Sequence, residues 1–276
     1  MNAYLTVISI VAIVLYLASG GLLGARLVKG AAITAAKPAA KYKASLLGLG
    51  LIAVLLHGIV LYHLLVTDAG LNLGFFNAIS LLLWFIALLL LLASIKSPVE
   101  NIGIVLLPLA ALALALEIFL PSDHVISSDM ALGLGIHILT SLLAYAVLSL
   151  ASVQAILVAI QHKHLHNRHP GGFVRALPPL ETMESLLFQM ITVGIAFLSV
   201  SLFSGFVSLD DMFAQDKVHK TVFAIIAWLV FAILLWGRWQ YGWRGRIAIR
   251  WTLVGFVALL LAYIGSKLVQ ELVLGR

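Results

Sequence analysis

Apolar runs of about 20 residues recur along the whole of this 276-residue chain, and they limit what it can fold into. At about 1.5 Å per residue, such a run forms a helix long enough to cross the roughly 30 Å hydrocarbon core of a bilayer. A helix also satisfies its own backbone hydrogen bonds, as lipid requires. The chain is 63% hydrophobic and only 10% charged, whereas soluble domains are roughly 25% charged. The sequence therefore predicts an all-α, polytopic integral membrane bundle.

Eight transmembrane helices account for these runs. The connectors are short, and the longest, over residues 161–185, is smaller than an independently stable fold of roughly 40 residues. We therefore expect one transmembrane domain over residues 1–276, made of a four-helix half (1–130) and a second half (131–276). The first run lacks the basic segment of a cleavable signal peptide, so we expect it to remain as a span. The expected spans are residues 3–23, 46–66, 73–94, 102–120, 131–160, 186–207, 221–236 and 247–269.

The distribution of Lys and Arg predicts the orientation of the bundle. One set of alternate loops holds thirteen of these residues and the other set holds four. Because cytoplasmic loops carry the excess of positive charge, both termini are expected outside the cytoplasm. The basic residues are scattered between apolar spans, which argues against nucleic acid as a partner and for membrane lipid.

Tryptophans gather where the last two spans meet the expected cytoplasmic face. They are Trp236, Trp239, Trp243 and Trp251, and basic residues lie between them in the sequence. This pattern is typical of an aromatic belt that anchors helices at the membrane interface, not of a catalytic site.

Two histidines within the spans are candidate ligands. His57 in the second span and His137 in the fifth fall at similar depth in the outer half of the bilayer. Ionisable groups at such depth need a partner, a cofactor or water. The chain has no cysteine and offers no carboxylate at this depth for a zinc site, whereas bis-histidine haem iron needs only two imidazoles. The alternative is that each histidine forms a hydrogen bond to a neighbouring helix.

Other titratable residues lie near the two faces. His219, just before the seventh span, either joins His137 as an outer ligand or is a solvated interfacial residue. Glu117 is expected to reach the outer headgroups. His162, His166 and His169 share one face if the fifth helix extends into the cytoplasm, where they either bind a transition metal or form a solvated basic cap.

Several segments resemble a known family. They are HILTSLLAYAVLSLASVQAIL, LPPLETMESLLFQMITVGIAFLSVSLFSG, KTVFAIIAWLVFAILLW, GWRGR and IRWTLVGFVALLLAYIGSKLV, in this order. From His137 onward the chain resembles the cytochrome c assembly family, which includes CcsA, ResC and CcmC, and it is most similar to the small YpjD branch. In this family His137 would match an external haem ligand, and His57 looks like the intramembrane histidine. The family's tryptophan-rich outer loop has no tryptophan here between Ser204 and Ala227, and its second external histidine is absent, so His219 would have to substitute.

The resemblance implies a haem-handling function in a bacterial inner membrane. We expect non-covalent, b-type haem with His57 and His137 as axial ligands and His219 as the weakest candidate, held or presented for c-type cytochrome maturation. The expected partners are apocytochrome c and other membrane assembly or transport proteins, and we expect a carrier, not an enzyme. Two alternatives remain: a haem-independent accessory subunit of a transporter or ion-efflux system, and an electron carrier that accepts electrons from a quinol.

Overall fold

The structure is a computed structural model that describes residues 3–29, 39–68, 70–120, 125–127, 132–167, 174, 177–208 and 218–262. Within these residues, seven helices are long and apolar enough to cross a membrane, which confirms the predicted helical membrane protein. The eighth predicted span begins with helix α9 (Arg246–Leu260), and the part of it from residue 263 lies outside the described residues. The count of eight spans and the outer position of both termini stay predictions.

The chain forms two compact units. The first comprises Met1–Ser128 with Arg168–Pro178, and the second comprises Asp129–Asn167 with Pro179–Arg276. The elements of the first unit are α1 (Ala3–Lys29), α3 (Ala39–Leu65), β1 (Val66–Thr67), β2 (Gly70–Asn72), α4 (Phe75–Lys96), the 3-10 helix η1 (Glu100–Ile102), α5 (Gly103–Phe119) and β3 (Val125–Ser127). Those of the second are α6 (Leu132–His166), α7 (Leu180–Ser208), α8 (Val218–Tyr241) and α9.

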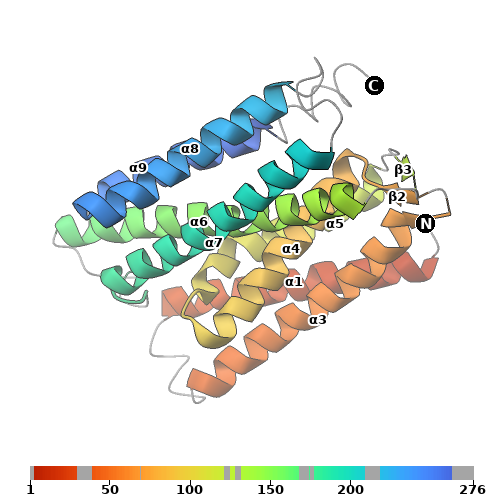
Figure 1. Cartoon of the computed structure of the whole chain (residues 1–276). Coiled ribbons are helices and arrows are strands. Elements are labelled where there is room, and N and C mark those ends of the chain that lie inside the picture. The colour runs from red at the N-terminus through yellow and green to blue at the C-terminus, as the bar shows by residue number, and fades with distance from the viewer. Residues whose placement is uncertain are drawn as a thin grey trace. The chain divides into compact units, whose positions relative to one another are not determined.

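The first unit is a ring of four long helices, in which α1 packs against α3 and α5, and α4 packs against the same two helices (Figure 1). Its core is apolar and includes the fully buried Tyr16 and Leu107. Helices α1 and α5 approach closely where Gly20 faces Pro108, because a Cβ on Gly20 would lie only 3.0 Å from the proline ring. Small residues that let helix backbones approach are the usual means of packing in lipid, where apolar burial gives little driving force.

The second unit repeats this arrangement with α6, α7, α8 and α9, each packed against two of the others. The contact between α6 and α7 is the most extensive of these. It depends on Gly194 of α7, where an added Cβ would lie 2.6 Å from the side chain of Leu148 in α6. Between α8 and α9, Gly242 and Gly245 adopt φ values of 66° and 56°, which favour glycine and close a tight turn.

A small antiparallel sheet covers one end of the first unit and departs from the all-helical prediction. Strand β2 lies between β1 and β3, with Val66 opposite Leu71 and Leu71 opposite Ile126. The strands follow α3, precede α4 and follow α5, so they join the ends of three helices. We call this the sheet end. The backbone N–H and C=O groups of these connecting segments have no partner within a helix, and the sheet pairs some of them.

The opposite end of the first unit carries an ion cluster around a buried carboxylate. Glu100, in η1, accepts from Arg26 Nη1 at 3.4 Å and lies 3.2 Å from Lys43 Nζ. This cluster connects α1, α3 and η1 where the chain returns toward α5. Two cations around one carboxylate stabilise that charge in a site from which water is largely excluded.

Candidate functional site

His57 lies at the centre of a hydrogen-bonded chain that crosses the first unit. Its side chain is fully buried, with Nδ1 3.2 Å from the Tyr16 hydroxyl oxygen and Nε2 2.9 Å from Ser80 Oγ. Ser80 in turn donates to Glu117 Oε2 at 2.5 Å. Since Tyr16, His57, Ser80 and Glu117 come from α1, α3, α4 and α5, the chain connects all four long helices of the unit.

The direction of these hydrogen bonds fixes the form of the imidazole. With Glu117 ionised, the Ser80 hydroxyl gives its one hydrogen to the carboxylate, so the Ser80 oxygen accepts from His57. His57 therefore carries its hydrogen on Nε2, and Nδ1 accepts from the Tyr16 hydroxyl. In this arrangement both ring nitrogens are satisfied by side chains of the first unit.

The position of Glu117 corrects two sequence-based expectations. Only 3% of Glu117 is exposed, so it turns inward to Ser80 and does not reach the headgroups. A carboxylate therefore does lie beside the buried histidine, contrary to the prediction that none is available there. Its second oxygen, Oε1, is buried and has no hydrogen-bond partner among the described residues. An acidic residue in a span is itself a functional signal, and placing Glu117 at the interface concealed it.

His137 has a different environment in the second unit. It lies in the first two turns of α6, partly buried, and its Nδ1 is 2.8 Å from the carbonyl oxygen of Ser201 in α7. A carbonyl oxygen can only accept, so Nδ1 carries the hydrogen and Nε2 carries the lone pair. Nε2 has no partner among the residues that the structure describes. Ser141, one turn along α6, supports this contact by approaching Ser201 Oγ at 2.6 Å.

The predicted pairing of His57 with His137 stays a prediction, because the two residues belong to different units. His219 lies in the first turn of α8, where its side chain is exposed. It makes no hydrogen bond to another described residue, so neither interpretation of this histidine is excluded.

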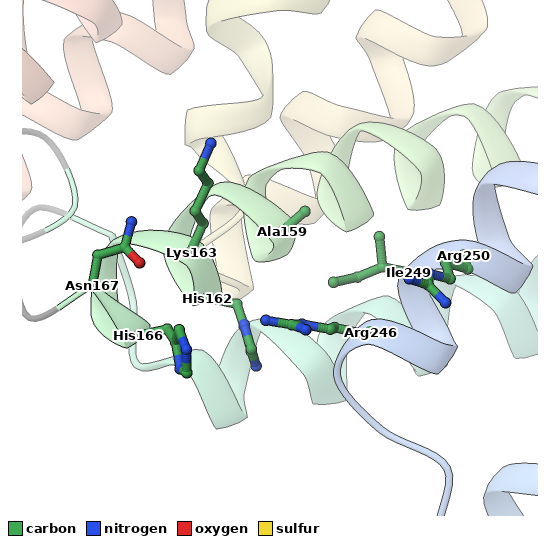
Figure 2. A pocket seen from close by; sticks show the side chains of 8 residues that line it. All are labelled: Ala159, His162, Lys163, His166, Asn167, Arg246, Ile249 and Arg250. Atoms are coloured by element: carbon green, nitrogen blue, oxygen red, sulfur yellow. The ribbon is translucent and has the colours of Figure 1, made fainter.

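The histidines at the end of α6 do not assemble a metal site in the described part of the chain. No group of three His, Asp or Glu side chains that could hold a metal ion occurs there. His162 and His166 instead line a cavity together with arginines from α9 (Figure 2). With His169 outside the described residues, both interpretations stay open.

The GWRGR segment positions the start of α9. Arg244 Nε donates to Glu184 Oε2 at 3.1 Å, and the backbone nitrogen of Gly245 donates to Glu184 Oε1 at 3.0 Å. Trp243 packs against Trp251, with ring centroids 5.5 Å apart, and lies over Gly237. The predicted aromatic belt is thus also a packed cluster at the turn between α8 and α9.

Comparison with known proteins identifies the relatives of this chain. The family described as cytochrome C assembly protein matches residues 47–274, which includes most of the four-helix half before His137. The inner membrane protein YpjD of Escherichia coli strain K12 is 32% identical over 228 residues, covering 80% of this chain and 85% of the relative. The cytochrome c biogenesis protein CcsA of Prochlorococcus marinus is 25% identical, covering 69% of this chain and 70% of the relative. Protein HemX of Brevibacillus brevis is 23% identical, covering 55% and 58%.

No solved structure matches the chain. The extent of the sequence matches and the membrane-spanning helices identify a multi-pass inner-membrane protein. The family match also supports a role in cytochrome c biogenesis. The chain belongs to the cytochrome c assembly family.

Proposed function

We propose that this chain binds b-type haem non-covalently within the membrane and presents it for the maturation of c-type cytochromes. Its membership of the cytochrome c assembly family supports this function, as does its similarity to proteins named for cytochrome c biogenesis. The geometry of His137 carries the proposal. Haem is the cargo of such a protein, and the chain need form no covalent bond to the macrocycle beyond ligation of the iron.

His137 fits an iron ligand. A ligating imidazole usually donates its other N–H to a carbonyl or carboxylate, which fixes the tautomer and orients the ring. The bond from Nδ1 to the Ser201 carbonyl oxygen does this here and leaves the Nε2 lone pair for a metal. The position is near the start of α6 and partly buried, so apolar helix surface is available to exclude water from a bound macrocycle.

His57 is the proposed second ligand, and it fits less directly. Binding through Nε2 would require the ring to release Ser80, move its hydrogen to Nδ1 and donate to the Tyr16 oxygen. Ser80 would keep its bond to Glu117. The cost is one buried hydrogen bond, about 0.6–2 kcal/mol in a membrane protein, which a metal–imidazole bond can offset. His219 remains the weakest candidate, because its exposed side chain offers no such orientation.

A haem-loading experiment tests the proposal. The wild type and the single variants His57→Ala, His137→Ala and His219→Ala would be expressed with added haem precursor and purified in detergent. Pyridine haemochrome and reduced-minus-oxidised spectra would give the haem content per folded protein. We expect a b-type spectrum in the wild type, near-complete loss in His137→Ala, partial or complete loss in His57→Ala and the smallest change in His219→Ala. His164→Ala is a matched control, since this imidazole bonds to the Ile160 carbonyl of its own helix.

A folded wild type that takes up no haem would refute the proposal. One observation would then favour the accessory-subunit function: both nitrogens of His57 are already engaged by neighbouring helices, as expected of a structural histidine. Copurification of a transporter or ion-efflux subunit with the haem-free protein would support that alternative.

A further inference from the structure

A second site lies in the second unit, away from both proposed haem ligands along the chain. It is a cavity of about 430 Å³ between the last turns of α6 and the first turns of α9. The GWRGR segment and its bond to Glu184 hold the start of α9 in place, so one rim of the cavity is fixed by a buried carboxylate. Figure 2 shows His162 from α6 and Arg246 from α9 reaching toward one another across it.

The side chains of α6 that line the cavity share one helical face. Ala159, His162, Lys163 and His166 are spaced by three, one and three residues, as neighbours on an α-helix are. The apolar Ala159 lies farthest from the end of α6, and the three polar residues lie between it and that end. This face therefore changes from apolar to cationic along the helix.

Helix α9 contributes more positive charge. Arg246 and Arg250 lie one turn apart, with the buried Ile249 beside them. Arg246 is also the first residue of α9, where the first backbone N–H groups point outward and carry the positive end of the helix dipole. Such an N-terminus adds to the arginines, since it favours a negatively charged group nearby.

The charges in this cavity are not compensated. Among the described residues, no acidic side chain lines it, and Lys163, Arg246 and Arg250 have no carboxylate partner. Two other cations near helix ends do have a carboxylate partner: Arg26 pairs with Glu100, and Arg244 pairs with Glu184. The carboxylate of Glu184 lies in the neighbourhood of His162, but Arg244 and the Gly245 backbone already occupy its oxygens. Three cations that line one cavity without an acid favour an anionic ligand.

The position of the cavity indicates where the anion comes from. Trp243 and Trp251 pack together at the same turn of the chain, and aromatic clusters of this kind mark the membrane interface. The cavity also has an apolar part at Ala159 and Ile249, which a free anion would not need. Basic pockets at the ends of transmembrane helices suit the headgroups of anionic lipids. We propose that this cavity binds the phosphate headgroup of an anionic phospholipid, with Arg246, Arg250 and Lys163 as its cationic contacts.

Lipid-dependent thermal stability of the purified full-length protein tests the proposal. Phosphatidylglycerol would be titrated into detergent-solubilised protein, with zwitterionic phosphatidylcholine as the comparison lipid, and Tm would be followed by tryptophan fluorescence. We expect phosphatidylglycerol, but not phosphatidylcholine, to raise Tm in a saturable way. Arg250→Gln should raise the half-saturating concentration by roughly five- to tenfold, since a cation near an anionic lipid contributes about 1 kcal/mol.

A matched variant separates the site from general charge effects. Lys96→Gln removes one exposed cation from the end of α4 in the other unit, so it should leave the half-saturating concentration unchanged. Equal stabilisation by both lipids, or equal responses of the two variants, would overturn the proposal. Inorganic phosphate at constant ionic strength forms a further arm: if it stabilises the wild type as phosphatidylglycerol does and loses this effect in Arg250→Gln, the ligand is a free anion and not a lipid. We expect both variants to fold, because both side chains are exposed and neither supports the core. Gel filtration would check this.

Discussion

Replacing Ser80 by alanine should destabilise the first unit far more than its size suggests. Ser80 Oγ accepts from His57 Nε2 and donates to Glu117 Oε2, so the substitution removes two inter-helix hydrogen bonds at once. In membrane proteins each such bond contributes about 0.6–2 kcal/mol. The change also leaves a buried N–H and a carboxylate oxygen without a partner, which costs about 1–3 kcal/mol more where no water can enter. We therefore expect a loss of about 2–7 kcal/mol in the free energy of unfolding.

The same helix offers a matched control. Ser94 is as fully buried as Ser80, but its Oγ donates to the carbonyl of Leu90, one turn back in the same helix. Ser94→Ala should therefore cost less than about 1 kcal/mol, because no contact between helices is lost. Both variants would be unfolded in mixed micelles of a mild detergent and dodecyl sulfate, with far-UV circular dichroism as the signal. If Ser80→Ala were no less stable than Ser94→Ala, the hydrogen-bonded chain would not contribute to stability as argued here.

Two further substitutions test the packing of the second unit by the same unfolding assay. Gly194→Ala should cost about 1–3 kcal/mol, because its Cβ would overlap a leucine of α6, whereas Gly135→Ala, which meets no atom within 4 Å, should be neutral or slightly stabilising. Equal effects would show that α6 and α7 are not in close contact. Glu184→Gln should cost about 1–3 kcal/mol by weakening the bonds from Arg244 and the start of α9, whereas the exposed Glu181→Gln should cost less than about 0.5 kcal/mol. A Glu181 effect as large as that of Glu184 would contradict this role.

The helices were predictable from the sequence because bilayer thickness sets the length of an apolar run. Each predicted span within the described residues corresponds to a helix, although α6 and α7 extend by several residues beyond the predicted ends. The gathering of tryptophans at the turn between α8 and α9 was also predictable. These features depend on composition along the chain, not on which side chains face each other.

The polar chain of the first unit was not predictable for a physical reason. Its helices are apolar on all sides, so no periodic pattern shows which face of α1 or α4 turns toward His57. Tyr16 and Ser80 look like ordinary members of an apolar span, and only their contacts in the folded unit single them out. The sheet was missed because strands of two or three residues are too short to show an alternating pattern.

The two histidines differ in what their removal would reveal. His137 bonds to a backbone carbonyl of one neighbouring helix, so His137→Ala should leave the second unit folded and report on haem directly. His57 connects three other helices through its two nitrogens and Ser80, so His57→Ala removes a proposed ligand and structural bonds together. Ser80→Ala removes the structural bonds while keeping the imidazole, and it frees Nε2 from its partner. Haem content per folded protein that falls in His57→Ala but persists in Ser80→Ala would therefore assign the loss to the imidazole as ligand, whereas equal losses would assign it to the damaged bundle.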